Sequence, residues 1–213
     1  MWLFCKLWHG VRPRGPDPLP SNGAAILISN HTCTADPLFL LCATRRMISF
    51  LMAREYYAIR LLQPIFNLNR TILVNRTGRD TAAIKATLRA LGEGRVVGIF
   101  PEGGINLDAQ RLREAKSGTA MLALLTRAPV IPAFIYRRRH TNHLLLGVLQ
   151  PARARIYFGK PIDLSSYYGS EHDASALARV TEILMSSIEQ LRPKGSAALQ
   201  ICANEPKTPQ VSG

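Results

Sequence analysis

The chain has 213 residues, 47% of them apolar and 19% charged, which suits one compact domain around a single core. Lys and Arg outnumber Asp and Glu by 27 to 14, and the formal net charge of +13 predicts an anionic partner: nucleic acid, a phosphate-bearing substrate or an anionic membrane. The composition excludes a disordered tail protein, a collagen and a coiled coil.

The four cysteines, at positions 5, 33, 42 and 202, show neither metal-ligand spacing nor a disulfide framework. No small-residue cleavage site follows the apolar opening segment. No apolar run approaches the roughly 20 residues that span a bilayer. We therefore expect no bound metal, no signal peptide, no transmembrane helix and a cytoplasmic location.

Residues 1–23 form a lead-in segment, because residues 11–23 contain four prolines and two glycines and are predicted to be a loop. The first eight residues combine large apolar side chains with one lysine. This mixture suits a short anchor at a lipid interface as well as it suits packing on the domain. The residues concerned are Trp2, Leu3, Phe4, Leu7 and Trp8 with Lys6.

From residue 24 onward, short β-branched runs alternate with helical patterns. Strands are predicted at 24–29, 48–53, 72–75, 96–100 and 130–135, and helices at 38–44, 54–63, 80–91 and 117–127. The strands are continuously apolar, as strands covered on both faces should be. This alternation predicts an α/β fold: a single domain with a largely parallel central sheet flanked by helices.

The C-terminal part breaks this alternation, since 144–149 and 153–158 are predicted as strands with no helix between them. The sheet is therefore expected to end in an antiparallel or irregular edge. A last amphipathic helix is predicted to start at Asp173 as its N-cap and to stop before Pro193. The domain then spans 24–192, and 193–213 is expected to be a disordered tail.

Reactive side chains follow three of the predicted strands, at the sheet edge where open parallel sheets bind ligands. His31 and Asp36 follow the first strand and are too far apart in sequence to touch within one helix or strand. Pro37 favours the first helical position, which predicts Asp36 as an N-cap and a chain reversal that brings its carboxylate to the imidazole. Such a contact would fix the ring tautomer and leave the other nitrogen free to accept a proton.

Taken alone, this pair is better explained by a loop histidine beside an ordinary N-cap. Cys33 is favoured as a small buried thiol over a nucleophile, because residues two apart rarely present that geometry. After the third strand, Arg76 is in isolation a solvated cation or a salt-bridge partner.

After the fourth strand, Glu102 is followed by Gly103 and Gly104. The glycines permit close backbone approach, their amides are able to face an anion, and Glu102 would point at the rim. In isolation, this segment is equally typical of a solvent-exposed turn with an acidic residue, in which the glycines only meet the backbone angles of the turn.

Together, these residues resemble the 1-acylglycerol-3-phosphate acyltransferase (phospholipid/glycerol acyltransferase) family. Asn30-His31 with Asp36 is similar to its His-x-x-x-x-Asp motif, and Ile-Leu-Val-Asn-Arg at 72–76 to its second block. Phe-Pro-Glu-Gly at 100–103 and Ala-Pro-Val-Ile-Pro at 128–132 resemble the third and fourth. The likeness runs from about 24 to 163, and four blocks in the right order are specific where one would be weak.

The resemblance implies transfer of an acyl group from acyl-CoA or acyl-carrier protein to the free hydroxyl of 1-acylglycerol-3-phosphate, which makes phosphatidic acid. His31 would be the general base, with no acyl-enzyme, and Asp36 would orient it. Arg76 would hold the acceptor phosphate, and Glu102 with Gly103 and Gly104 would position the acceptor. No metal or redox cofactor is implied.

Three departures from the family pattern matter. Arg70-Thr71 stands where a glycine is usual ahead of the second block, and Gly104-Ile105 replaces the frequent Thr-Arg after the third. The N-terminal anchoring helix of many members is missing, so we expect peripheral attachment to the cytoplasmic side of an anionic membrane. The opening segment and the basic run 137–140 are the candidates for that contact.

Two alternatives stay open. One is the same chemistry on another lysolipid, such as a lysophospholipid or an acylated amino-acid lipid. The other is a non-catalytic basic module that binds RNA or membrane by charge. The chain shows no RNA-binding signature, so a nucleic-acid partner is not expected.

Overall fold

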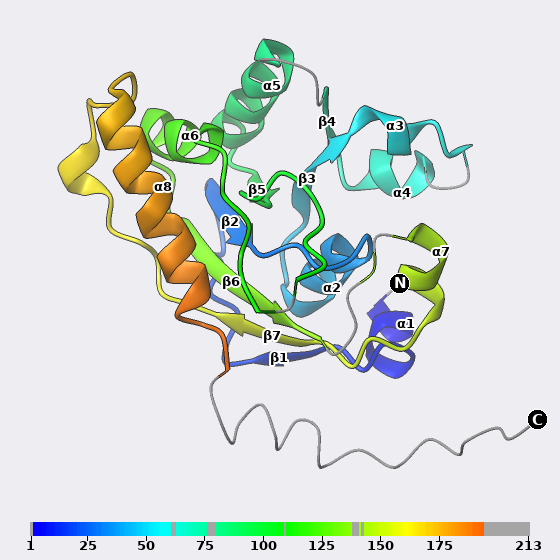
Figure 1. The fold of residues 1–213 in the computed structure, drawn as a ribbon. Helices are drawn as coiled ribbons and strands as arrows, with labels where there is room; N and C mark the ends of the chain where they lie inside the picture. The colour runs from blue at the N-terminus through cyan, green and yellow to red at the C-terminus, as the bar shows by residue number, and fades with distance from the viewer. Residues whose placement is uncertain are drawn as a thin grey trace, which may run out of the picture.

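The computed structural model describes residues 2–60, 63–75, 80–108, 110–137, 141 and 143–193. These residues contain a seven-stranded sheet of order β1-β7-β6-β2-β5-β3-β4 (Figure 1). All neighbouring strands are parallel except β6 and β7, which are antiparallel. The expected single α/β domain with a largely parallel sheet is confirmed. The strands are β1 (Arg12–Arg14), β2 (Ala25–Ser29), β3 (Ile48–Ala53), β4 (Ile72–Val74), β5 (Val96–Ile99), β6 (Val130–Tyr136) and β7 (Arg155–Phe158).

Helices cover both faces of this sheet (Figure 1). α5, α6 and α8 lie over one face, and α2 lies over the other with α1 packed beside it. The helices are α1 (Trp2–Leu7), α2 (Asp36–Ala43), α3 (Arg54–Tyr57), α4 (Gln63–Leu68), α5 (Thr81–Gly92), α6 (Gly118–Thr126), α7 (Leu144–Leu149) and α8 (Ala174–Glu189), with a short 3₁₀ helix at Ser165–Tyr167.

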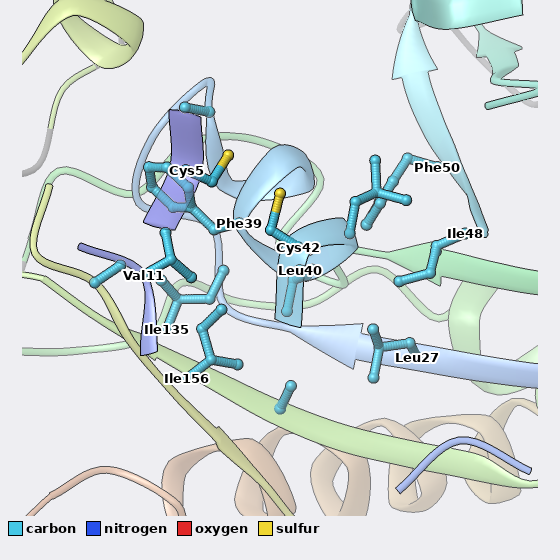
Figure 2. Packing of buried hydrophobic residues seen from close by; sticks show 14 of the residues in the cluster. Cys5, Val11, Leu27, Phe39, Leu40, Cys42, Ile48, Phe50, Ile135 and Ile156 are labelled. Carbon is cyan, nitrogen blue, oxygen red and sulfur yellow. The ribbon is translucent and has the colours of Figure 1, made fainter. Parts of the chain in front are cut away.

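Two hydrophobic clusters account for the continuously apolar strands. In β2, Leu27 belongs to the cluster under α2, whereas Ile26 and Ile28 belong to the cluster under α5, α6 and α8. Figure 2 shows Phe39 and Leu40 of α2 over the first of these faces. Each fully buried side chain of this size contributes about 1.5–3 kcal/mol, so both faces favour the same strand register.

The predicted ends of the longer helices agree with the structure. Asp80 caps α5 by accepting a hydrogen bond from the amide of Ala83 at 3.0 Å, and Asp173 caps α8 by accepting from Ser175 at 2.8 Å. Val180 is one of the α8 side chains buried against the sheet. Among the described residues, no helix combines the length and the apolar character needed to cross a bilayer.

Four sequence-based expectations fail locally. Residues 144–149 form helix α7 instead of a strand, and 12–14, predicted as loop, form β1 against β7. The predicted helix 54–63 is divided into α3 and the start of α4. Arg137 of the basic run is buried, with its guanidinium 5.9 Å from the centre of the Phe39 ring, so it does not face headgroups. Of the predicted tail 193–213, residues 194–213 lie outside the described residues.

Candidate active site

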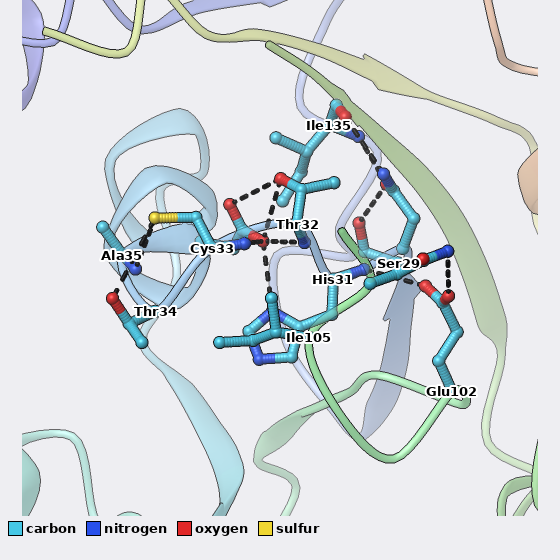
Figure 3. Close-up of polar contacts among 12 residues, drawn as sticks. Ser29, His31, Thr32, Cys33, Thr34, Ala35, Glu102, Ile105 and Ile135 are labelled. Carbon is cyan, nitrogen blue, oxygen red and sulfur yellow. Dashed lines mark hydrogen bonds and ion pairs between the residues drawn. The ribbon is translucent and has the colours of Figure 1, made fainter. Parts of the chain in front are cut away.

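The turn between β2 and α2 carries the first candidate pair (Figure 3). Nδ1 of His31 lies 3.1 Å from Oδ2 of Asp36, so the structure brings together the two residues that the sequence paired. Asp36 is completely buried, and its Oδ2 also accepts hydrogen bonds from the amides of Thr32 at 2.6 Å and Cys33 at 2.8 Å. The hydroxyl of Thr32 donates to the same carboxylate at 3.3 Å, so four donors hold it inside a single tight turn.

The predicted capping role of Asp36 is wrong. The N-cap of α2 is Ala35, Pro37 lies in the first turn, and the Asp36 side chain makes no capping bond. Its carboxylate turns back and accepts from the preceding amides of Thr32 and Cys33 instead. A carboxylate that accepts a hydrogen bond from Nδ1 fixes the imidazole tautomer with its proton on Nδ1, and the lone pair of Nε2 is then available to accept a proton.

Aromatic rings fix the plane of the imidazole. The ring of Phe100 stacks on His31 with 4.0 Å between centroids and 13° between planes, and Phe50 stacks behind Phe100 at 5.7 Å. Gly98 makes room for this stack, since a Cβ there would lie 2.3 Å from an atom of the Phe50 ring. The phenylalanine of the Phe-Pro-Glu-Gly block thus supports the histidine, a role that sequence reasoning did not assign.

Glu102 does not point at the rim as expected. It is 4% exposed, and its two oxygens accept from the amide of His31 at 3.0 Å, from Nδ2 of Asn106 at 2.9 Å and from the amide of Arg113 at 2.8 Å. The amide of Asn106 in turn donates to the carbonyl of His31 at 2.7 Å. The peptide groups on both sides of His31 are therefore held by the loop that follows β5.

The side chain of Asn30 extends the hydrogen bonding between β2 and β6 by one residue beyond the end of β2. Its Nδ2 donates to the carbonyl of Ile135 at 3.0 Å, and its Oδ1 accepts from the amide of Ile135 at 2.7 Å. The sequence motif contained this asparagine without a stated role. Its amide accepts and donates in the manner of a backbone residue, which fixes the start of the turn that bears His31.

Gly103 and Gly104, two further predicted residues, lie in the loop that follows β5. Gly103 adopts φ +66°, a left-handed conformation that favours glycine, and its amide donates to the carbonyl of Phe100 at 2.9 Å. Gly103 and Gly104 both line a cavity that His31 also lines. Arg76 lies outside the described residues, but the preceding Asn75 lines the same cavity.

That cavity has a volume of about 410 Å³, within the range usual for small-molecule sites. It is formed mainly by apolar side chains of α2, α4, α5, β3 and β5. His31 and Lys116 are among the polar residues that line it. An apolar chamber with a basic nitrogen in its wall suits a reaction on a molecule with a long hydrocarbon chain.

Cys33 is a buried, free thiol in the turn beside Asp36. Burial raises the pKa of this thiol, and the negative charge of Asp36 raises it further. A thiol needs its ionised form to attack a carbonyl, so these surroundings oppose a nucleophilic role. Within the described residues, no group of three or more His, Cys, Asp or Glu side chains is arranged to hold a metal ion.

The sequence matches the model of a protein family named Acyltransferase over residues 10–136. This span includes the turn with His31 and Asp36 and the loop with Glu102. The chain belongs to the acyltransferase family.

Similar proteins agree with this assignment. The chain is 28% identical over 135 residues to a 1-acyl-sn-glycerol-3-phosphate acyltransferase of Borreliella burgdorferi, a match that covers 62% of this chain and 52% of that protein. It is 23% identical over 203 residues to a protein of the same name from Bacillus subtilis, with 91% of this chain and 98% of that one covered. Against an uncharacterized protein of Mycobacterium tuberculosis, identity is 24% over 228 residues, covering 88% of this chain. The chain thus spans only 52% and 62% of the lengths of the Borreliella and Mycobacterium relatives.

The fold also matches a solved structure, that of the 1-acyl-sn-glycerophosphate (LPA) acyltransferase PlsC from Thermotoga maritima. The TM-score is 0.64 at 20% sequence identity, and the match covers 90% of this chain and 76% of the other. At this identity the likeness establishes a common fold.

Proposed function

We propose that the protein transfers a fatty acyl group from acyl-CoA or acyl-carrier protein to the free hydroxyl of 1-acylglycerol-3-phosphate and so makes phosphatidic acid in phospholipid biosynthesis. The observation that carries this proposal is that His31 lines the apolar cavity and contacts the buried Asp36 at 3.1 Å. Family membership and the names of the relatives from Borreliella and Bacillus support the same reaction.

In the proposed reaction, Nε2 of His31 removes the proton of the acceptor hydroxyl as its oxygen attacks the thioester carbonyl. The C–S bond then breaks, and the leaving thiolate receives the proton from the imidazolium. Asp36 stabilises the positive charge of the ring between these two transfers. A thioester has a good leaving group, so a positioned base, worth about 10²- to 10⁴-fold, acts without metal or redox chemistry.

The cavity is proposed to hold the hydrocarbon chain of the transferred acyl group. Its lining includes Leu41 of α2, Phe66 of α4 and Ile84 of α5, which would bury the chain away from water. Each methylene buried there is worth about 0.8 kcal/mol, so the chamber binds the chain without polar contacts. His31 then meets the carbonyl at one end of that chain.

The test is a transfer assay with radiolabelled acyl-CoA or acyl-carrier protein and a panel of lysolipid acceptors, with His31→Ala as the control. We expect labelled phosphatidic acid from lysophosphatidate, and a loss of about 10²- to 10⁴-fold in the variant while its circular dichroism spectrum is unchanged. Absence of product with every donor and acceptor, together with salt-sensitive binding to polyanions, would instead favour the basic binding module.

A second candidate is the same transfer to a different lysolipid. The sequence feature that favours it is Gly104-Ile105, where the family frequently has Thr-Arg. A preference for a phosphate-free lysolipid over lysophosphatidate in the same panel would support this alternative.

We further propose that α1 and α7 rest on an anionic membrane from the cytoplasmic side, as a peripheral contact. Leu7 and Trp8 are 75% and 49% exposed, and Trp8 donates through Nε1 to the carbonyl of Leu149, which is itself 62% exposed. Lys6 is exposed among them, and Val148 lines the cavity. Figure 1 places α1 beside α7, so the apolar surface adjoins the wall of the acyl chamber.

Flotation with vesicles tests this contact. Phosphatidylglycerol vesicles should retain the protein better than phosphatidylcholine vesicles, and Leu7→Ser should weaken retention. Leu125→Ser, on α6, is the matched control, because Leu125 is also exposed but lies on the opposite face of the sheet. Equal retention of both variants would contradict the proposal.

A further inference from the structure

Asn69 directly follows helix α4 and brings a buried polar atom without a partner to the apolar cavity. The residue is 6% exposed, it lines the cavity together with His31, and within the described residues its Oδ1 has no hydrogen-bond partner. Its backbone is paired on both sides: the amide donates to the carbonyl of Ile65 at 3.1 Å, and the carbonyl accepts from Oγ of Ser49 at 3.1 Å. An acceptor buried without a donor is unfavourable, so this oxygen is suited to a ligand that brings a donor.

A second buried polar side chain of the same cavity is already satisfied. Thr87 of α5 is completely buried and also lines the cavity, but its hydroxyl donates to the carbonyl of Ala83 at 2.8 Å. Threonine often uses its hydroxyl in this way within a helix. The oxygen of Asn69 therefore differs from a polar atom that merely lies in an apolar wall.

Hydrogen bonds hold the segment around Asn69 in place. Arg70 adopts φ +47°, a left-handed conformation that ends α4, and its amide donates to the carbonyl of Asn67 at 3.0 Å. Arg95 donates through Nη2 to the carbonyl of Arg70 at 2.9 Å and to the hydroxyl of Ser49. These bonds fix the backbone next to Asn69 against the start of β3, so the side chain stays at the wall of the cavity.

The strand register places Asn69 deeper in the molecule than His31, toward the amino ends of the strands. Ser49, which bonds Asn69, pairs with Val97 of β5. Val97 is 3 residues before Phe100, whose ring stacks on His31. At about 3.3 Å per residue, the two levels are separated by about 10 Å. Three extended residues contain nine backbone bonds, so a hydrocarbon chain with its carbonyl at His31 reaches this depth at about carbon 10.

We propose that the chamber recognises an acyl chain with a hydroxyl group near its middle, and that Oδ1 of Asn69 accepts the hydrogen bond from this hydroxyl. The inference rests on the proposed function and specifies the donor as a hydroxyacyl thioester. A hydroxyl fits because it donates to the oxygen and leaves the rest of the chain apolar. A chain without it leaves the oxygen unpaired, and a hydroxyl elsewhere on the chain is buried among apolar side chains without this acceptor.

The experiment measures transfer to lysophosphatidate from octadecanoyl-CoA, 3-hydroxyoctadecanoyl-CoA and 10-hydroxyoctadecanoyl-CoA. The proteins are the full chain, Asn69→Leu and Asn67→Leu. Leucine is branched at Cγ as asparagine is but has no polar side-chain atom, so it removes the acceptor and keeps the wall filled. Asn67 belongs to the same helix, is exposed and does not line the cavity, which makes it the matched control.

We expect the full chain to use 10-hydroxyoctadecanoyl-CoA with a kcat/KM about three- to tenfold above that for octadecanoyl-CoA. In Asn69→Leu, this ratio should fall on the order of tenfold or more, because the hydroxyl is then buried without an acceptor. Asn67→Leu should keep the ratio of the original protein, and the 3-hydroxy donor should gain nothing from Asn69. The Tm of Asn69→Leu should equal or exceed that of the original protein, since an unpaired polar group is replaced by an apolar one.

Three results would overturn the inference. The first is the same ratio of kcat/KM values in Asn69→Leu as in the original protein, whether or not all transfer is slower. The second is a loss of that ratio in Asn67→Leu equal to the loss in Asn69→Leu. The third is an equal preference for the 3-hydroxy and 10-hydroxy chains.

Calorimetric binding of the free acids, octadecanoate and 10-hydroxyoctadecanoate, tests Asn69 independently of transfer. The original protein should bind the hydroxy acid more tightly, and Asn69→Leu should lose this preference. Equal affinities for the two acids in the original protein would contradict the inference. Failure of the original protein to transfer any of the three chains, by contrast, would contradict the proposed function itself.

Discussion

The backbone amide of His31 donates to Oε1 of Glu102 at 3.0 Å, across 71 residues of sequence. On the other side of the same residue, the carbonyl of His31 accepts from the amide of Asn106 at 2.7 Å. The loop after β5 therefore forms hydrogen bonds with both peptide groups that flank the candidate base. In this arrangement, the Phe-Pro-Glu-Gly block acts as a scaffold for the histidine as much as a wall of the substrate site.

Glu102→Gln should lower kcat about 10- to 100-fold with a change of less than about threefold in the KM for the acceptor. The side-chain nitrogen of glutamine cannot accept a hydrogen bond, so one of the N–H groups that now donate to Glu102 would lose its acceptor. This loss should displace His31 and leave the binding site of the lysolipid unchanged. The disturbed hydrogen bonds should also cost about 1–3 kcal/mol of the free energy of unfolding. Steady-state kinetics and thermal unfolding measure both effects. A large rise in KM with kcat unchanged would instead assign Glu102 to acceptor binding.

Asp36→Asn should reduce kcat by about 10²- to 10⁴-fold. An asparagine amide can present its nitrogen to Nδ1 and so favour the wrong imidazole tautomer, with the proton on Nε2. ¹⁵N chemical shifts of labelled histidine report that tautomer directly. Asp163→Asn, an exposed carboxylate after β7, is the control and should retain full activity. An active Asp36→Asn protein would remove the carboxylate from the mechanism.

Gly147→Ala should destabilise the site from the side of α7. A Cβ there would lie 2.4 Å from Oγ1 of Thr34 and 2.8 Å from Sγ of Cys33, so the turn that bears His31 would have to move. We expect a loss of about 1–3 kcal/mol in the free energy of unfolding, or several degrees in Tm. Gly92→Ala, with nothing within 4 Å of its added Cβ, should change Tm little or raise it. Equal Tm values for the two variants would contradict the packing.

Ala83→Phe should shorten the acyl chain that the protein accepts. Ala83 is buried in α5 and lines the cavity, whereas its neighbour Ala82 is exposed and does not. A phenyl ring in the chamber should lower kcat/KM for a hexadecanoyl donor on the order of tenfold more than for an octanoyl donor. Ala82→Phe should leave the ratio unchanged. A uniform loss for both chain lengths would place the acyl chain elsewhere.

Cys33→Ala should retain activity within a few-fold. Burial and the charge of Asp36 raise the pKa of the Cys33 thiol, so at pH 8 less of it is ionised than in a free cysteine. Iodoacetamide reacts with the thiolate, so it should modify Cys33 in the folded protein slowly and only as the pH rises further. Mass spectrometry of alkylated peptides measures this. Rapid alkylation with parallel inactivation would return Cys33 to consideration as a nucleophile.

The layers and the meeting of His31 with Asp36 could be predicted from the sequence, because local signals determine both. Continuously apolar strands indicate burial on both faces of the sheet, and Pro37 indicates a chain reversal before the helix. The direction of the Asp36 carboxylate could not be predicted in the same way. Its choice between the amides of the helix and those of the turn depends on the three-dimensional path of residues 31–35.

Long-range contacts explain the remaining errors. The inward orientation of Glu102 depends on donors from His31, Asn106 and Arg113, of which one is 71 residues away. The short apolar run 144–149 fits a strand or a helix equally well by periodicity. It forms α7, and Gly147 there permits close approach to the turn with Cys33 and Thr34, a contact that no local pattern reveals.

The most direct test of the account is a double-mutant cycle on transfer to lysophosphatidate with His31→Ala, Asp36→Ala and the double variant. If Asp36 acts only through the imidazole, the double variant should lose no more kcat than His31→Ala alone, within about threefold. Losses that multiply in the double variant, or a His31→Ala protein that keeps its activity, would contradict the claim that these two residues form one catalytic unit.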